Sequence, residues 1–225
     1  MKKESNIVTT NQLGINKNLC DIAKRNIEFE FKKPYSDFSI ETFKNIIDWI
    51  ELKNINNIIL DIGCGVGEST INLANKYQDC LVIGIDKSLD RIKRNNDFKK
   101  NIPENMLLVR GNVIDLWPMF LERKKTLNIV KQYILYPNPY PKEKHVKLRW
   151  HGHPIFQSIL NIKSPIEVRS NWRLYLEEFE FMVNEYGQQF ILKLELFTPE
   201  KSITPFERKF LESSQDLFVL NLTPL

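Results

Sequence analysis

The chain has 225 residues, 42% of them hydrophobic, so it is long enough for one domain with a large core. Its net charge of +4 is modest, and its three cysteines lack metal-type spacing, which indicates a reducing compartment and no zinc site. The sequence shows neither a secretory signal nor an apolar run of roughly 20 residues, so we expect a soluble, cytoplasmic protein with no membrane partner.

The N-terminal part differs in character from the rest of the chain. Residues 1–35 are polar and only weakly periodic, so we expect an arm or lid, and residues 36–225 are expected to form the folded domain. Residues 40–52 are predicted to be a helix because their apolar positions recur at helical spacing, and residues 54–57 break that pattern. The apolar positions are Phe43, Ile46, Ile47 and Ile50.

A glycine-rich loop follows the first predicted strand. The strand covers residues 58–60 and ends at Asp61, residues 69–77 look helical, and a second apolar strand over residues 81–85 ends at Asp86. Glycine permits a tight strand-to-helix turn and lets a ligand approach the backbone closely. The loop glycines are Gly63, Gly65 and Gly67.

The alternation of strands and helices continues along the chain. It predicts an α/β fold with an open, mostly parallel sheet of about seven strands. No long crossover helix separates the last two strands, so we expect them to form an antiparallel hairpin whose connection includes residues 204–207. The other predicted elements are a helix near 90–100, a strand over 106–109, a loop with Gly111 and Asn112, a strand over 129–135, a helical stretch around 153–160, a strand over 166–169, a helix over 171–186, and strands over 190–197 and 217–222.

A proline-rich loop, Tyr-Pro-Asn-Pro-Tyr-Pro-Lys over residues 136–142, comes directly after a predicted strand. Proline cannot donate to a sheet ladder and keeps the preceding residue extended, so the strand must stop there. Ligands of open α/β sheets bind outside the carboxyl ends of the strands. We therefore expect Asn138 and Tyr140 to be held rigidly, next to Lys142, against a flat and partly polar substrate, with Tyr140 as the stacking side chain. A turn without chemical function is the alternative.

Basic residues follow this loop. This stretch contains four basic side chains and a single acidic one, Glu143. Such an excess of positive charge indicates either a strip that attracts a polyanion or a solvated helix face. The cations are Lys142, Lys144, Lys147 and Arg149.

Two further groups of polar residues lie downstream. His151 and His153 have no carboxylate nearby in sequence, so contacts at a helix start or with substrate are expected rather than a metal site. Arg169 and Arg173 could contact phosphate, although Arg173 can equally pair with Glu177 four residues further on.

The spacing of the glycines favours one cofactor over another. A dinucleotide fingerprint needs Gly-x-Gly-x-x-Gly, whereas this loop reads Gly-x-Gly-x-Gly and follows an acid. Asp61 could bind a cationic amino-acid group, and Asp86 could accept both hydroxyls of a ribose. These residues favour S-adenosylmethionine over NAD.

The arrangement resembles the class I S-adenosylmethionine-dependent methyltransferases, whose Rossmann-like fold is a mostly parallel seven-stranded sheet with an antiparallel last strand and helices on both faces. Over about residues 56–207 the chain is similar to the tRNA (guanine-N7)-methyltransferase family. The matching segments are the glycine loop, the proline-rich loop with its basic residues, Ser170-Asn171-Trp172 and Thr204-Pro205-Phe206-Glu207.

The resemblance implies S-adenosylmethionine as cofactor and tRNA as partner, with no metal; monomer and homodimer both stay open. Asn138 stands at the catalytic position of the family. The residues implied to bind the cofactor are Asp61, Gly63, Gly65, Gly67, Asp86, Asn112 and Asn138. Those expected to hold the target guanosine are Tyr140, Lys142, Asn171, Thr204, Phe206 and Glu207.

The chain departs from the family where Asn112, Asn138 and Asn171 replace aspartates. Guanine N7 carries a lone pair and needs no deprotonation, but the methylated purine is cationic and a carboxylate would favour it. Exchanging a carboxylate for an amide dipole could slow the reaction by about a hundredfold. Proximity and alignment of the reactants would survive, so we expect activity to be weakened or redirected, not abolished.

Two alternatives stay open. Residues 138–141, Asn-Pro-Tyr-Pro, also resemble the Asn-Pro-Pro-Tyr loop of methyltransferases that act on exocyclic or amide nitrogens of adenine or glutamine. There an asparagine accepts hydrogen bonds from the target NH₂ while the aromatic ring stacks on the substrate. The second alternative is a catalytically impaired homologue that binds RNA or a partner.

Overall fold

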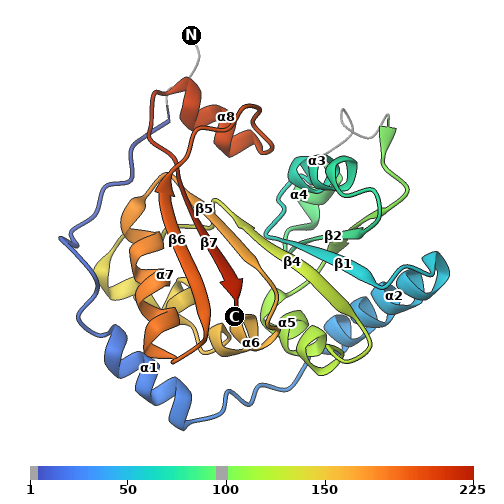
Figure 1. Ribbon diagram of the computed structural model, residues 1–225, viewed down its shortest axis with the longest axis horizontal. Coiled ribbons are helices and arrows are strands. Elements are labelled where there is room, and N and C mark those ends of the chain that lie inside the picture. The colour runs from blue at the N-terminus through green and yellow to red at the C-terminus, as the bar shows by residue number, and fades with distance from the viewer. Residues whose placement is uncertain (1–4, 95–100) are drawn as a thin grey trace. The chain divides into compact units, whose positions relative to one another are not determined.

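The computed structural model describes residues 5–94 and 101–225, and its strands have the order β3-β2-β1-β4-β5-β7-β6 (Figure 1). Contacts within the chain group into two compact units. Unit 1 comprises residues 1–32 and 136–225, and unit 2 comprises residues 33–135.

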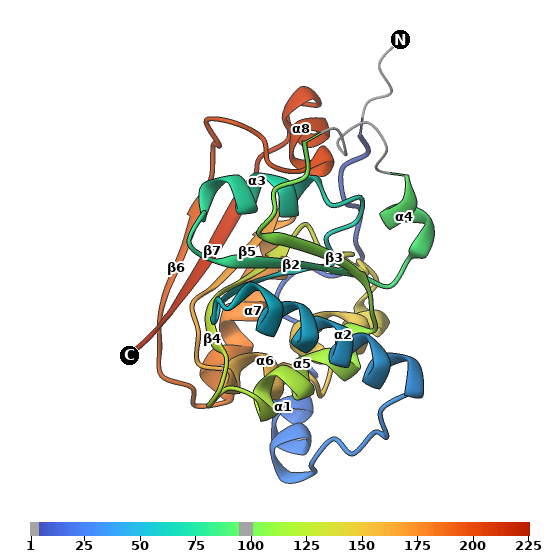
Figure 2. The same cartoon turned by 90° about the vertical axis from the view of Figure 1, so that its right-hand side faces the viewer.

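Unit 2 holds the first four strands, all of them parallel. The strand β1 pairs with β2 and β4, and β2 pairs with β3. Figure 2 shows α3 on one face of β2 and β3, with α2 and α5 on the other. The elements are α2 (Asp37–Lys53), β1 (Asn57–Ile62), α3 (Glu68–Lys76), β2 (Leu81–Asp86), α4 (Leu89–Lys93), β3 (Met106–Arg110), α5 (Val113–Glu122) and β4 (Asn128–Leu135).

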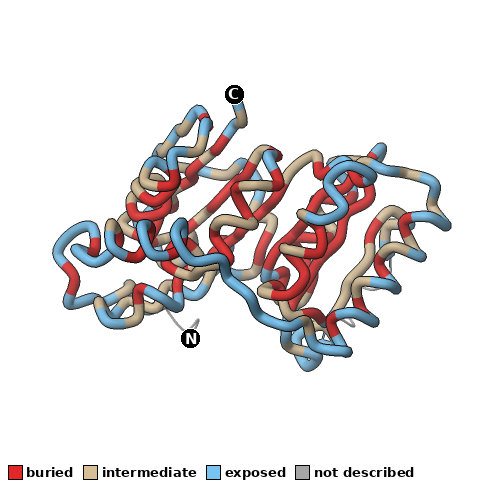
Figure 3. Tube along the Cα trace, turned by 90° about the horizontal axis from the view of Figure 1, so that it is seen from below, coloured by how far each residue is buried: buried red, intermediate tan, exposed pale blue. Residues whose placement is uncertain are grey.

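The strands β1 and β2 form the centre of this unit. Every residue of β2, and every residue of β1 after Asn57, is buried, as Figure 3 shows for the strands. Continuous apolar runs of this kind are typical of parallel strands covered on both faces. The helix α2 begins at Ser36, whose side chain accepts a hydrogen bond from the Ser39 amide, and ends at Asn54 in the left-handed conformation.

Unit 1 holds the last three strands. The strand β7 is antiparallel to both β5 and β6, α7 packs against all three, and α1 packs against α7 (Figure 1). The elements are α1 (Leu19–Glu28), the 3-10 helices η2 (Glu143–Leu148) and η3 (Trp150–Gly152), α6 (Phe156–Asn161), β5 (Ile166–Ser170), α7 (Arg173–Glu185), β6 (Phe190–Leu196), α8 (Pro205–Glu212) and β7 (Phe218–Pro224).

The expected fold class is confirmed: seven strands, an antiparallel last strand, and the order found in class I methyltransferases. Three α-helices were missed, namely α1, α5 and α8, the last of which lies in the connection expected between the two closing strands. The helix α1 lies within the polar residues 1–35, and its buried Leu19, Ile22, Ala23 and Asn26 follow helical spacing. The helix α5 was missed although its apolar content is high; it is continuous from Val113 to Glu122 with Pro118 inside it, a residue that normally argues against a helix interior. Part of the helix expected near 90–100 lies outside the described residues, since α4 ends at Lys93 and residues 95–100 are not described.

None of the helices within residues 5–94 and 101–225 combines the length and apolar character that a membrane span requires.

Candidate functional site

The glycine loop of unit 2 has a backbone that other residues rarely adopt. Gly63, Gly65 and Gly67 have φ angles of 74°, 61° and 84°. A Cβ atom on Gly63 or Gly65 would meet nothing within 4 Å, whereas one on Gly67 would lie 2.6 Å from Leu108 Cδ1. All three positions therefore need glycine for conformation, and the third also needs it for packing against β3.

The side chain of Asp61, which precedes this loop in the chain, is fully buried. Its Oδ2 accepts hydrogen bonds from Ser69 Oγ at 2.6 Å and Thr70 Oγ1 at 2.7 Å, but its Oδ1 has no hydrogen-bond partner among the described residues. Burial raises the pKa of Asp61 to about 6. The two hydrogen bonds lower this pKa, but their effect is smaller, and the charge of Asp86 raises it further. An orphaned, buried carboxylate oxygen fits the ammonium group of an amino-acid moiety.

Asp86 ties the loop to the end of β2. Its Oδ2 accepts a hydrogen bond from the Gly65 amide at 3.0 Å, and its Oδ1 accepts one from the Ser88 amide at 2.8 Å. Arg91 Nη1 lies 3.4 Å from Oδ2. Each carboxylate oxygen has two lone pairs, and the two donors on Oδ2 and one on Oδ1 leave one site, on Oδ1, for a ribose hydroxyl.

Asn112 lies at the start of α5, next to the carboxyl end of β3. Its Oδ1 caps the helix by accepting a hydrogen bond from the Ile114 amide at 3.2 Å, and the preceding Gly111 donates its amide to the Asp86 carbonyl at 3.0 Å. Asp61, Asp86, Asn112 and the glycines thus gather around the carboxyl ends of β1, β2 and β3. The amide nitrogen of Asn112 is a donor where an aspartate offers only acceptors.

The proline-rich loop of unit 1 is conformationally strained. Tyr136 and Tyr140 each precede a proline and were expected to be extended, but that expectation is wrong, because their φ angles are positive, at 51° and 44°, which bulky residues rarely adopt. The exposed Asn138 stabilises the loop from within, because its Oδ1 accepts a hydrogen bond from the Tyr140 amide at 3.3 Å. Lys142 at the end of the loop is also exposed, and Tyr140 is partly buried.

The Thr-Pro-Phe-Glu segment begins α8 and has a structural role in this protein. Thr204 Oγ1 accepts a hydrogen bond from the Glu207 amide at 2.9 Å, which caps the helix. The buried Glu207 carboxylate accepts hydrogen bonds from Tyr136 Oη at 2.8 Å, Arg169 Nη1 at 2.7 Å and the Ile203 amide at 2.7 Å. Contact of Thr204 and Glu207 with a nucleoside stays a prediction.

Asn171 and Phe206 are placed differently. Asn171 is partly buried and its Nδ2 donates a hydrogen bond to Gln215 Oε1 at 2.8 Å, whereas the Phe206 side chain is 53% exposed. Phe206 is therefore available for stacking, and Asn171 is already engaged.

Two of the sequence interpretations change, and a third is confirmed. Arg149 does not belong to an exposed basic strip, because it is fully buried, while Lys142, Lys144 and Lys147 are exposed. Arg169 does not face solvent as a phosphate ligand but pairs with Glu167 and Glu207. The pairing of Arg173 with Glu177, at 2.8 Å, is confirmed.

Lys142 and Lys144 line a hollow of about 600 Å³ together with residues of the N-terminal arm. The remaining lining residues are Thr9, Thr10, Asn11 and Glu143.

The histidines form no metal cluster. Within residues 5–94 and 101–225 no group of three or more histidine, cysteine, aspartate and glutamate side chains could hold a metal ion. His151 is buried instead, with its Nε2 at 3.0 Å from Glu178 Oε2. The sequence interpretation missed Glu178, because that carboxylate lies far along the chain on α7.

The sequence matches a known family and several proteins of known activity. The model of the family Methyltransf_4, described as putative methyltransferase, matches residues 55–220. The tRNA (guanine-N(7)-)-methyltransferase of Clostridium botulinum (strain Okra / Type B1) is 32% identical over 106 residues, which are 44% of this chain and 47% of that protein. The enzyme of the same name from Mycoplasma genitalium is 27% identical over 169 residues, 69% of this chain and 78% of that protein. The chain spans about half the length of the first of these relatives.

Solved structures show the same fold. The 16S rRNA methyltransferase KamB superposes with a TM-score of 0.58 at 15% identity, covering 87% of this chain and 97% of that one. An antibiotic-related methyltransferase gives a TM-score of 0.54 at 15% identity, over 85% of this chain and 96% of that one. At such low identity the likeness concerns the fold alone.

Proposed function

Because the chain belongs to the Methyltransf_4 family of putative methyltransferases, we propose that it is an S-adenosylmethionine-dependent methyltransferase that acts on guanine N7 in tRNA. In this proposal residues 36–225 are the methyltransferase domain and residues 1–35 are an arm. The names of the relatives from C. botulinum and M. genitalium support the reaction.

One observation carries the cofactor assignment. The fully buried Asp61, which comes just before the glycine loop in the chain, keeps one carboxylate oxygen without a hydrogen-bond partner among the described residues, and there is free space around the Cα atoms of Gly63 and Gly65. A buried acceptor without a donor is costly, and the ammonium group of S-adenosylmethionine would supply the donor. Asp86 would hold a ribose hydroxyl, and Asn112 and the loop glycines would complete the cofactor contacts.

The acceptor side is assigned to unit 1. Asn138, Lys142 and Phe206 are exposed there, and Tyr140 is partly exposed, so a planar base has both amide and aromatic groups to bind. In the proposal Asn138 keeps its catalytic and cofactor-lining roles, and Asn171, Thr204 and Glu207 contact the target guanosine together with Tyr140, Lys142 and Phe206.

The reaction needs little from the protein beyond alignment and electrostatics. When bound, S-adenosylmethionine supplies an electrophilic methyl group on a sulfonium centre. Guanine N7 offers its own lone pair, so no residue has to act as a base. The purine becomes cationic, and the carbonyl dipole of Asn138 would favour that charge less strongly than a carboxylate.

Incubation with S-adenosylmethionine labelled in its methyl group tests the function. Bulk tRNA should gain label, and borohydride and aniline treatment should cleave it at the modified guanosine. A chain that fails to bind the cofactor would contradict the proposal. Label in protein or in an exocyclic nitrogen would favour the Asn-Pro-Tyr-Pro alternative.

The substitution Asn138→Asp separates the two substrate classes. An aspartate retains the oxygen that accepts the Tyr140 amide, so the loop should keep its conformation, and it adds a charge near the developing cation. We expect transfer to guanine N7 to be maintained or to rise by up to about a hundredfold. The measurement is kcat with tRNA. A loss of activity with unchanged cofactor binding would contradict the guanine assignment.

A further inference from the structure

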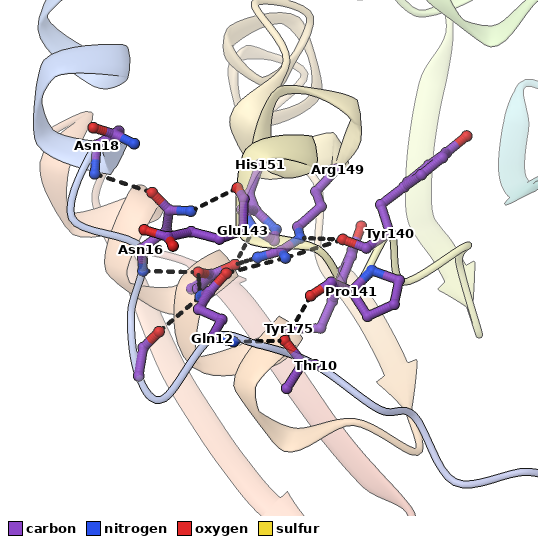
Figure 4. A network of polar contacts seen from close by, with 12 residues as sticks. Thr10, Gln12, Asn16, Asn18, Tyr140, Pro141, Glu143, Arg149, His151 and Tyr175 are labelled. Atoms are coloured by element: carbon purple, nitrogen blue, oxygen red, sulfur yellow. Dashed lines mark hydrogen bonds and ion pairs between the residues drawn. The ribbon is translucent and has the colours of Figure 1, made fainter.

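A buried polar cluster joins the N-terminal arm to the proline-rich loop in unit 1 (Figure 4). Arg149, His151 and Glu178 are fully buried, and Gln12 of the arm is 7% exposed. Burying charged groups at this depth is costly unless they are paired and hydrogen-bonded. The contacts of each group therefore indicate what the cluster stabilises.

Glu178 lies at the centre of the cluster. Its Oε2 pairs with Arg149 Nη1 and with His151 Nε2, and its Oε1 accepts hydrogen bonds from Gln12 Nε2 and from the Asn16 amide, the latter at 2.9 Å. Burial would raise the pKa of Glu178, but the hydrogen bond from His151 and the charge on Arg149 outweigh it and lower the pKa to about 2. The carboxylate is thus ionised, and two of its bonds come from the arm.

Arg149 connects this cluster to the proline-rich loop through hydrogen bonds to Tyr140. Its Nε and Nη2 donate hydrogen bonds to the Tyr140 carbonyl at 3.3 and 3.0 Å, and Nη2 also donates one to Gln12 Oε1 at 3.1 Å. Tyr140 has a positive φ angle, so its conformation needs such external contacts. Gln12 orients the guanidinium that holds Tyr140.

The arm also contacts the loop directly. Thr10 Oγ1 donates a hydrogen bond to the Pro141 carbonyl at 2.6 Å and accepts one from the Gln12 amide at 3.0 Å. The Glu143 amide donates to Asn11 Oδ1 at 3.1 Å, and Asn16 Nδ2 donates to the Glu143 carbonyl at 3.0 Å. Residues of the segment 10–16 therefore bind the backbone directly at Pro141 and Glu143, whereas the Tyr140 carbonyl is bound by Arg149.

We propose that residues 10–16 hold the proline-rich loop in the conformation that methyl transfer requires, with Thr10 and Gln12 as positioning residues. The inference rests on the proposed function for its catalytic part only. The loop contains no glycine, and both of its tyrosines have positive φ angles, so its own residues do not favour the shape it adopts. The arm supplies the donors and acceptors that stabilise this shape.

Two substitutions test the inference in the full chain. Thr10→Val removes the hydroxyl while keeping the size of the side chain, and Thr10→Ser restores the hydroxyl. Gln12→Ala removes the amide group from the cluster. With either Thr10→Val or Gln12→Ala, hydrogen–deuterium exchange of residues 136–149 should become faster, because the Tyr140 and Glu143 amides lose protection. With tRNA, kcat should fall about tenfold, while the dissociation constant for S-adenosylmethionine should not change.

Leu13→Ala is the matched control, since that neighbouring side chain is fully exposed and should change neither exchange nor kcat. Thr10→Ser should restore wild-type exchange and kcat, which a general loss of stability would not explain. Unchanged exchange in Thr10→Val and Gln12→Ala would overturn the inference, and so would faster exchange with an unchanged kcat in an active enzyme. If the unsubstituted chain methylates no tRNA but the exchange differences persist, the proposed function is wrong, whereas the inference that the arm stabilises the loop is supported.

Discussion

The variant Asp61→Asn is expected to lose affinity for S-adenosylmethionine by at least about a hundredfold and yet to be more stable than the original chain at neutral pH. The affinity falls because the amide replaces the carboxylate whose unpaired Oδ1 is the proposed ligand of the cofactor ammonium. Isothermal titration calorimetry with the cofactor and thermal unfolding of the free protein measure the two effects.

The gain in stability follows from the pKa of Asp61. Burial raises this pKa to about 6, above the ordinary value of 3.8, so the folded chain prefers the protonated form. A carboxyl group whose pKa is higher in the folded chain stabilises the fold fully at pH values below its unfolded pKa. This stabilisation is lost as the pH rises through the folded pKa. Between pH 4 and 6 the free energy of unfolding of the original chain should fall by about 2 to 3 kcal/mol, whereas that of the asparagine variant should not show this fall.

Cofactor affinity should depend on pH in the opposite direction. The ammonium group requires the ionised form of Asp61, so affinity should fall as pH drops below about 6. Asp48→Asn is the control, because Asp48 is exposed on α2 and its substitution should not change cofactor affinity. Unaltered cofactor affinity in Asp61→Asn would refute the role assigned to this carboxylate.

The substitution Glu178→Gln should destabilise the chain by about 3 to 5 kcal/mol, because it leaves the buried Arg149 without its carboxylate. Such a loss is a large part of the stability of an ordinary domain. Urea unfolding at pH 7 measures it, and Glu177→Gln provides the matched control. Glu177 is the preceding residue on the same helix, but its pair with Arg173 is largely exposed and should contribute less than about 1 kcal/mol.

At acidic pH most of the difference in unfolding free energy between the original chain and Glu178→Gln should disappear. The pKa of Glu178 is lowered to about 2 from an ordinary 4.5, so its contribution is present above pH 4.5 and is lost as pH falls toward 2. The original chain and Glu178→Gln should therefore converge in stability near pH 2. Equal unfolding free energies for the two chains at pH 7 would contradict the role of the ion pair.

The geometry of the candidate cofactor site could be predicted from the sequence because its parts are local. An apolar strand, an acid, a glycine loop and a helix are consecutive in the chain, and β2 follows within the same βαβ unit. Parallel pairing of β1 with β2 then brings Asp61 and Asp86 to one edge of the sheet. The hydrogen bond from the Gly65 amide to Asp86 follows from that pairing.

The acceptor half could be predicted only in outline. The motifs identified Asn138, Tyr140 and Lys142, but not what holds them, and Arg149 was read as exposed because it closes a run of basic residues. The weak periodicity of residues 1–35 concealed α1 and gave no sign that Gln12 is buried.

The sequence by itself determined the fold class, the glycine loop, the acids beside it and the end of β4 at the proline-rich loop, because each depends on residues close together in the chain. Only the tertiary structure decided that Arg149 is buried and paired with Glu178, that Glu207 is bonded at the start of α8, and that the arm is hydrogen-bonded to the loop. Those contacts join residues as distant as Gln12 and Glu178, 166 positions apart. Local periodicity carries no information about such pairs, since they form only when packing removes water from both partners at once.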